Sequence, residues 1–312
     1  MRRAGVSGLI LSRLGLGTMT WGRDTDEHEA ADQARAFIDA GGNFLDTANT
    51  YGDGDSERVI GGLVGTLFNR DEVVIATKSG VSFPDGVKKI DASRHSLIAE
   101  LDKSLSRLGS DFVDIWQIHM WDSLTPLDET LAALDYAYTT GRARYVGVSN
   151  FSAWQLARSA TKQSSSPLKA PITTTQNEYS LLNRDIEVEL IESAAHCGVG
   201  LLAWAPLARG VLTGKYRNGI PSDSRGAAPH FTRHIEPYLD ARSSRTVEAV
   251  AVAAAGLGYS PLEVALAWVR DAPGVTSAIV GARTGAQLRG ILKSEEIHLP
   301  DIVRSALNDV SL

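Results

Sequence analysis

The sequence predicts an α/β fold, a (β/α)8 TIM barrel, because short apolar runs alternate with amphipathic stretches along the whole chain. Most of the runs are continuously apolar, which is typical of parallel strands that are buried on both faces. Eight such runs match the number of strands in a closed barrel. The expected strands are 14–18, 43–46, 73–77, 113–118, 145–148, 173–177, 199–204 and 277–280.

Helices fit between these strands, and several carry signals at their ends. Ser93 precedes apolar residues at three- and four-residue spacing, and Gly109 follows them in the position that closes many helices. Pro126 opens the next helix, because its fixed φ suits a first helical turn. The expected helices are 27–40, 56–67, 93–108, 127–140, 153–161, 186–197, 243–257 and 261–270.

An open, doubly wound sheet would give the same alternation of strands and helices, and it is the alternative fold. That fold normally carries G-x-G-x-x-G after its first strand. Here the first strand runs into GLGTMTWGRD, which lacks this order, so the sequence favours the barrel.

Two segments depart from strict alternation. Residues 1–13 precede the first strand, and we expect them to form an N-terminal hairpin over the base of the barrel. Residues 206–242 form a long loop after strand seven, and a connection of this length usually serves as a lid or binding loop. No repeat or linker-like composition divides the chain, so we expect residues 1–312 to form a single domain.

Composition excludes several classes of partner. The net charge is −6 with Lys and Arg scattered, so nucleic acid and anionic membranes are not expected partners. Cys197 is the lone cysteine, which excludes an internal disulfide. No run approaches the roughly 20 apolar residues of a membrane span, and no secretory signal is recognisable, so we expect a cytoplasmic protein. The sequence indicates no oligomeric state.

A metal site has little support. His230 and His234 have H-x₃-H spacing, and Glu236 is the nearest carboxylate. This spacing places two ligands on one face only in a helix, and prolines flank the segment. We therefore expect no bound metal.

Four residues with acid–base chemistry stand at or just beyond the ends of predicted strands: Asp46, Tyr51, Lys78 and His119. A barrel places its catalytic groups at these ends. An ammonium beside a phenol favours the phenolate, and a carboxylate would hold that ammonium in place. The set suits protonation of an oxygen that gains negative charge. Each residue alone could be a cap, a packed ring or a solvated charge, but their occurrence together favours a catalytic site.

The chain also resembles the aldo-keto reductases, and within them the bacterial branches related to the potassium-channel β subunits. The resemblance runs from about Leu14 to Leu292 in the family's order. The segments that carry it are LGLGTMTWG, FLDTANTYGDGDSE, VIATKSG, IWQIHMWD, GRARYVGVSNF, TTQNEYSLLNR and WAPLARGVLTGKY.

The resemblance implies reduction of a small-molecule aldehyde or ketone by NADPH, with NADH as a possible substitute. Tyr51 would be the general acid, Lys78 and Asp46 would tune it, and His119 would orient the carbonyl. Trp21 would line the substrate pocket. The positions implied for cofactor binding are Ser149, Asn150, Gln176, Leu207, Arg209, Gly210, Lys215, Gly281, Arg283 and Gln287.

The cofactor-binding pattern has one departure. Family members often carry Glu and Asn near adenine, where this chain has Gly290 and Ile291, which puts the preference for NADPH over NADH in doubt. Arg283 keeps a guanidinium suited to a phosphate.

Two other functions remain open. One is an NADP(H)-binding regulatory subunit with little turnover, and the other is a barrel hydrolase or isomerase. The substrate is not identified, although the long loop offers aromatic candidates for contacting it: His230, Phe231, His234 and Tyr238.

Overall fold

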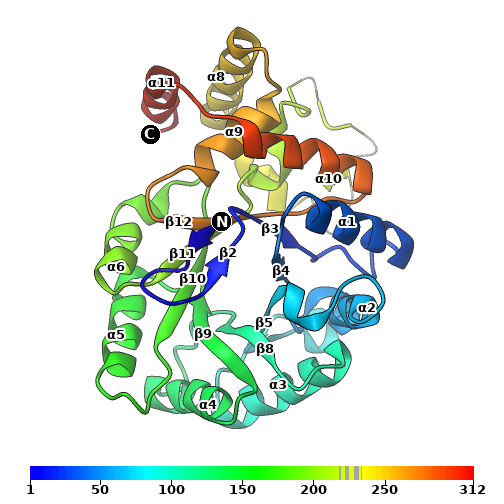
Figure 1. The fold of residues 1–312 in the computed structure, drawn as a ribbon. Helices are drawn as coiled ribbons and strands as arrows, with labels where there is room; N and C mark the ends of the chain where they lie inside the picture. Colours follow the sequence, from blue (N-terminus) through cyan, green and yellow to red (C-terminus); the bar gives the residue numbers. More distant parts are fainter. Residues whose placement is uncertain (218, 222–224, 228–231, 233) are drawn as a thin grey trace.

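Eight parallel strands close into a barrel in the computed structural model, which describes residues 1–217, 219–221, 225–227, 232 and 234–312 (Figure 1). The closed barrel confirms the predicted (β/α)8 fold and excludes the open sheet. Its strands, in order around the barrel, are β3 (Leu14–Gly17), β4 (Phe44–Asp46), β5 (Val74–Ser79), β8 (Val113–Ile118), β9 (Ala143–Ser149), β10 (Ile172–Glu178), β11 (Gly200–Trp204) and β12 (Val275–Val280).

Helices surround the barrel (Figure 1), and both end signals predicted for the helix that follows Ser93 are confirmed. Ser93 accepts a hydrogen bond from the Ser96 amide at the start of α3 (Arg94–Leu108), and Gly109 ends that helix with a φ of 59°. The helices are α1 (Glu27–Asp39), α2 (Asp55–Leu63), α3 (Arg94–Leu108), α4 (Leu127–Thr139), α5 (Ala153–Ser164), α6 (Leu190–His196), α8 (Ala241–Leu257), α9 (Pro261–Arg270), α10 (Gly285–Leu292) and α11 (Asp301–Ser311).

Two helices are shorter than predicted. Helix α2 ends at Leu63 and not at residue 67, and Gly65 in the turn that follows has a φ of 76°. The predicted helix 186–197 is divided into a 3₁₀ turn at Asp185–Glu187 and the helix α6. Both C-terminal helices, α10 and α11, were not predicted.

The predicted N-terminal hairpin is confirmed. β1 (Arg2–Arg3) pairs with β2 (Ile10–Leu11) in antiparallel fashion, and Figure 1 shows this hairpin lying across the barrel opening. Its side chains join residues of the barrel interior in one apolar cluster, which therefore closes the base. The cluster contains Ala4, Leu9, Leu11, Phe44, Ala76, Ile115, Leu202 and Ile279.

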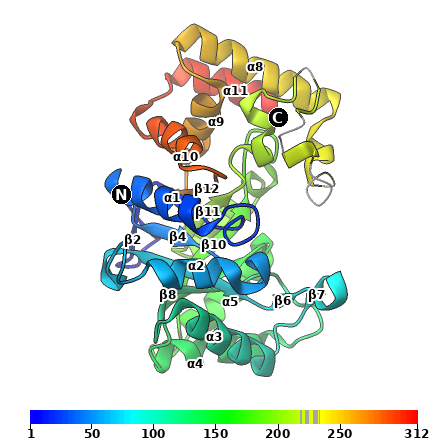
Figure 2. The same ribbon diagram turned by 90° about the vertical axis from the view of Figure 1, so that its right-hand side faces the viewer.

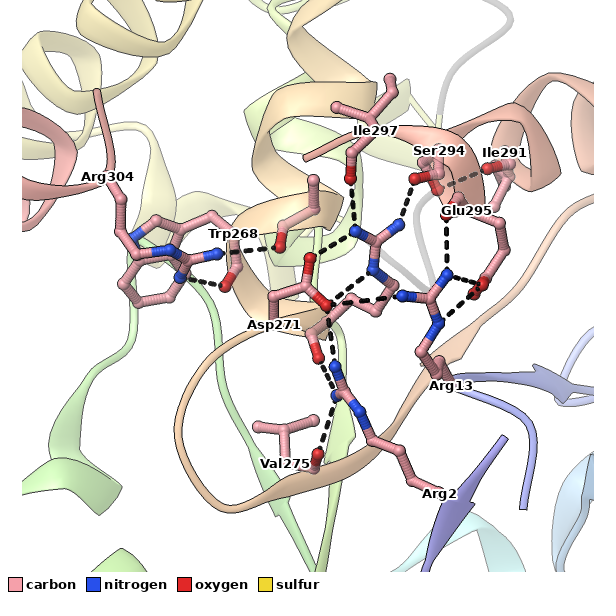
Figure 3. A network of polar contacts seen from close by, with 12 residues as sticks. Arg2, Arg13, Trp268, Asp271, Val275, Ile291, Ser294, Glu295, Ile297 and Arg304 are labelled. Atoms are coloured by element: carbon pink, nitrogen blue, oxygen red, sulfur yellow. Dashed lines mark hydrogen bonds and ion pairs between the residues drawn. The ribbon is translucent and has the colours of Figure 1, made fainter. Parts of the chain in front are cut away.

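A charged cluster fixes this hairpin to the end of the chain (Figure 3). The Asp271 carboxylate forms an ion pair with Arg2 at 2.8 Å and also pairs with the fully buried Arg270. Arg13 pairs with Glu295 at 2.6 Å and lies 3.9 Å from the same Asp271 oxygen. We call these five residues the Asp271 cluster, and it joins the first and last elements of the barrel.

The long connection after β11 contains three 3₁₀ turns among its described residues, at Ala208–Thr213, Arg225–Ala227 and Glu236–Tyr238. A second hairpin, β6 (Val81–Ser82) with β7 (Lys89–Ile90), was not predicted. Figure 2 shows it on the opposite side of the barrel from the N-terminal hairpin. Among the described residues no single helix is long and apolar enough to span a membrane; only α8 and α9 together reach that length, with a 101° bend between them.

Candidate active site

A cavity of about 1080 Å³ opens at the carboxyl ends of the barrel strands, where a barrel carries its binding site. Residues from the ends of all eight strands or from the loops that follow them line it. Asp46, Tyr51 and His119 lie at one end of the cavity. The other end is lined by Arg283, just before α10, and by Gln287 in its first turn. Three of the four predicted strand-end residues and all ten residues implied for cofactor binding therefore line one cavity.

Lys78 lies behind the cavity wall with its side chain fully buried. Its Nζ donates to Asp46 Oδ2 and to the Thr47 carbonyl, each at 2.8 Å, and it lies 3.5 Å from the Tyr51 hydroxyl. Burial lowers the pKa of Lys78, but the charge of Asp46 and the contact with Tyr51 more than offset this and leave the pKa raised. The amine is therefore charged, and the predicted Asp–Lys–Tyr contact is present.

Tyr51 holds its proton at neutral pH. Burial raises the pKa of its phenol, and the nearby Lys78 charge, which acts in the opposite direction, does not cancel that effect. The sequence predicted the lowering effect of Lys78 but not the larger effect of burial. A protonated phenol at the cavity wall is able to donate a proton to a bound oxygen.

His119 is neutral in this site. Burial, followed by the charges of Lys78 and Lys88, lowers the pKa of the imidazole to about 3. Its ring meets the Tyr51 ring edge-on, with centroids 6.1 Å apart. Its Nδ1 is buried and has no hydrogen-bond partner among the described residues. A neutral imidazole beside the phenol can orient an oxygen by hydrogen bonding without bringing a second charge.

Ser149, Asn150 and Gln176 form a connected polar group beside this pair. Gln176 Nε2 donates to Asp46 Oδ1 at 2.8 Å, and Ser149 Oγ donates to the Gln176 carbonyl at 3.0 Å. Asn150, in the left-handed region with a φ of 56°, donates to the His119 carbonyl at 3.0 Å. Its Oδ1 accepts from the Trp204 indole at 3.2 Å. All three predicted polar residues line the cavity next to the Asp–Lys pair.

The segment after β11 bends sharply along the cavity. Ala208, Arg209 and Gly210 have φ values of 44°, 57° and 95°, a run of left-handed residues. Leu207, Arg209, Gly210 and Lys215, four of the positions implied for cofactor binding, all line the cavity. The Arg209 Nε is buried and lacks a hydrogen-bond partner among the described residues. Its guanidinium lies 3.7 Å from Glu178 and over the Trp204 ring.

The far end of the cavity is formed by the start of α10. Gly281, Arg283 and Gln287 line it, and the Gln287 side chain accepts a hydrogen bond from the Arg283 amide at 3.0 Å. Gly290 also lines it, and a Cβ added there would meet no atom within 4 Å. Arg289, the neighbour of Gly290, makes a two-point contact with Asp32 at 2.9 and 3.1 Å.

Trp21 does not line the cavity, which corrects its predicted place in the substrate pocket. Its side chain is fully buried, and its indole donates to Gln33 at 3.1 Å. The cavity-lining residues of this segment are Met19, Thr20 and Arg23. Trp21 therefore packs behind the wall, because its indole finds a buried partner on α1.

The β6–β7 hairpin supplies cavity residues that the sequence reading missed. Val81, Phe83 and Lys88 line the cavity, and Phe83 is 44% exposed. The Pro84-Asp85-Gly86 turn between two short β-type runs was the available signal for this hairpin. It was overlooked because each strand is only two residues long.

In the part of the chain that the structure describes, no three His, Cys, Asp or Glu side chains lie together as a metal site. His234 lines the cavity, whereas His230 and Phe231 lie outside the described residues.

The fold and the cavity define a barrel enzyme with a buried lysine–aspartate pair at the wall of its cavity. The aldo/keto reductase family model matches residues 13–311, so the chain belongs to that family. It is 36% identical to L-glyceraldehyde 3-phosphate reductase of Escherichia coli, with 92% of this chain and 85% of the relative covered. It is 34% identical to a probable voltage-gated potassium channel subunit beta of Arabidopsis thaliana, with 95% and 91% covered.

A third relative, aldo-keto reductase YhdN of Bacillus subtilis, is 31% identical over 91% of this chain and 85% of its own length. These relationships, together with the barrel, make the protein an NAD(P)H-dependent oxidoreductase. They support carbonyl reduction as its general reaction.

Proposed function

We propose that this protein reduces an aldehyde or ketone with NADPH and that Tyr51 delivers the proton. The observation that carries this proposal is the position of Lys78 Nζ, 2.8 Å from Asp46 and 3.5 Å from the Tyr51 hydroxyl, at the wall of the cavity. A charged amine next to a phenol stabilises the phenolate that remains after proton transfer. NADH is the alternative hydride donor.

Each of the four strand-end residues has its own role in the proposed reaction. Tyr51 donates its proton to the carbonyl oxygen, and Lys78 stabilises the phenolate that results. Asp46 keeps Lys78 charged and in place through its 2.8 Å contact. Neutral His119 donates a hydrogen bond to the same oxygen and orients the carbonyl. When bound, the dinucleotide supplies the hydride.

The polar residues of the cavity fit a dinucleotide. Ser149, Asn150 and Gln176 would hold the carboxamide beside the proton donor, and this would fix the ring face that is presented. The unpartnered Arg209 Nε suits a phosphate oxygen, and a guanidinium at Arg283 suits a second phosphate. The other positions proposed to contact the cofactor are Leu207, Gly210, Lys215, Gly281 and Gln287.

The test is the Tyr51→Phe variant, compared with Tyr138→Phe at an exposed tyrosine. Loss of the proton donor should lower kcat for a simple aldehyde by about 10³-fold, within the usual range for a positioned acid. The Kd of NADPH, measured by fluorescence titration, should stay unchanged in both variants. Aldehyde reduction by Tyr51→Phe at the wild-type rate would refute the role of Tyr51.

A regulatory subunit with little turnover is the second candidate, because one relative is named as a probable channel β subunit. The complete set of Asp46, Tyr51, Lys78 and His119 favours the reductase, since a sensor does not need a proton donor. Tight NADPH binding with no oxidation across a panel of aldehydes would favour the regulatory function.

A further inference from the structure

Lys88 is a cation at the cavity mouth with no part in the proposed proton transfer. It lies in the turn segment of the β6–β7 hairpin and lines the cavity together with Val81 and Phe83. Its neighbour Lys89 does not line the cavity and pairs instead with Asp91 at 3.2 Å. Of two adjacent lysines, one therefore borders the cavity and the other is neutralised outside it.

The charge of Lys88 reaches the reacting end of the cavity. After burial and Lys78, Lys88 is the third cause that lowers the pKa of the His119 imidazole. Lys88 forms no hydrogen bond or ion pair with any other residue that the structure describes. Its ammonium is therefore available to a ligand that lies beside His119.

The backbone that carries Lys88 is held at its base by several hydrogen bonds. Val81 pairs with Ile90, and the Asn49 side chain donates to the Val81 carbonyl at 3.1 Å. Just before the hairpin, the Gly80 amide donates to Glu100 at 2.7 Å. A cation on an anchored hairpin loses less conformational entropy on binding than one on a free loop.

At this end of the cavity Lys88 is set apart from the other cations by its lack of a carboxylate partner among the described residues. Asp46 pairs with Lys78 inside the wall, and Arg23 pairs with Asp24 at 2.8 Å. Asp53 lines the same end but forms no ion pair with Lys88. An anionic group of the substrate would supply the partner that Lys88 lacks.

We propose that Lys88 binds an anionic group of the substrate, so the protein reduces carbonyl compounds that also carry a carboxylate or a phosphate. This proposal rests on the proposed reductase function and adds the class of its substrate. The carbonyl would lie between Tyr51 and His119, and the anion would extend toward the hairpin. Phe83 would cover the apolar part between them.

The test is steady-state kinetics on matched pairs of substrates, with wild type, Lys88→Met, Lys88→Arg and the control Lys89→Met. One pair is succinic semialdehyde and its methyl ester, and the other is glyceraldehyde 3-phosphate and glyceraldehyde. Loss of a charge-assisted contact at a partly exposed site should raise KM for the anionic member about tenfold in Lys88→Met. Its kcat and its kinetics with the neutral member should not change.

Lys88→Arg should keep the preference because it keeps the charge, and Lys89→Met should behave as wild type. The substrate pair whose anionic member is preferred over its neutral member identifies the anion as carboxylate or phosphate. Equal kcat/KM for charged and neutral members in wild type, or an equal rise of KM for both in Lys88→Met, would overturn the proposal while the reductase function stands.

If no aldehyde is turned over, the reductase function falls and the anion site is decided by binding alone. Calorimetry with succinate and with glycerol 3-phosphate, in the presence of NADP⁺, gives that measurement. Weaker binding by Lys88→Met than by Lys89→Met would support the anion site, and equal binding by both variants would refute it.

Discussion

The hydroxyl of Tyr238 donates a 2.6 Å hydrogen bond to Glu178 at the end of strand β10. Arg209, from the start of the same long connection, lies 3.7 Å from the same Glu178 oxygen. Burial, followed by Glu178, raises the pKa of Tyr238 to about 12, so this phenol remains a donor at neutral pH. Glu178 therefore holds both ends of the 206–242 connection.

We expect Tyr238→Phe to weaken NADPH binding and to leave the chemical step unchanged. Loss of a hydrogen bond to a charged group costs about 1.5–3 kcal/mol. Only part of this loss should appear in the free energy of NADPH binding, so we expect Kd to rise about three- to tenfold. Fluorescence titration measures Kd, and single-turnover kinetics measures the chemical step. Tyr259→Phe, at an exposed tyrosine, is the control. An unchanged Kd in Tyr238→Phe would show that Glu178 does not position this segment.

The rate of carbonyl reduction should not change between pH 5 and pH 9. His119, with its pKa lowered to about 3, is neutral throughout this range, so the usual histidine step near 6.5 should be absent. Tyr51, with its pKa raised above 10, stays protonated and able to donate. Oxidation of the alcohol needs the phenolate and should rise with pH up to the end of the range. A reduction profile with an inflection near 6.5 would assign the proton to His119 instead.

Replacement of Asp271 by Asn should destabilise the fold. The carboxylate faces Arg2, Arg13 and Arg270, and its removal leaves three guanidinium groups without their common partner. We expect a loss of about 2–3 kcal/mol in the free energy of unfolding, less than for a completely buried pair. The exposed pair of Glu248 with Arg217 provides the control, since Glu248→Gln should cost less than about 1 kcal/mol.

Urea unfolding at several pH values measures how much Asp271 contributes to the free energy of unfolding. Burial raises the pKa of Asp271, but Arg270 and Arg2 outweigh it and leave the pKa lowered. The contribution of Asp271 is therefore present above the usual aspartate pKa near 3.9 and is lost as the pH falls through the lower, folded value. Equal stability of Asp271→Asn and wild type at pH 7 would contradict this assignment.

Gly290→Glu should tighten the binding of NADPH. Gly290 lines the cavity, and space is open where its Cβ would stand, so a longer side chain fits and can reach the adenine end. We expect Kd to fall about threefold to tenfold, the effect of one added hydrogen bond. Gly290→Ala should only stabilise α10, by about 0.5–1 kcal/mol, without a gain in affinity. Equal affinities of the two variants would show that the added carboxylate makes no contact.

The sequence predicted the features that depend on local patterns. Apolar runs and end signals such as Ser93 and Gly109 identified the strands and most helices. The positions of Asp46, Lys78 and His119 relative to the strand ends then predicted one site, and the structure places these residues together.

Other features depend on distant contacts that no local pattern encodes. The sequence could not show that Trp21 turns toward Gln33 and away from the cavity. Nor could it show that burial outweighs the charge of Lys78 in setting the pKa of Tyr51. The sequence alone does not distinguish Lys88 from Lys89, and their different environments follow from the register of a hairpin whose two strands are each two residues long.

The Asp271 cluster also has a consequence for how the chain acquires its structure during synthesis. The barrel closes where Leu14 of β3 meets Ala278 of β12, and Arg2 reaches Asp271 at the same seam. Contacts between such distant positions carry a large loop-closure cost and form late. A nascent chain on the ribosome would therefore remain an open, incomplete sheet until β12 has emerged. Until then, one edge of β3 has no partner strand.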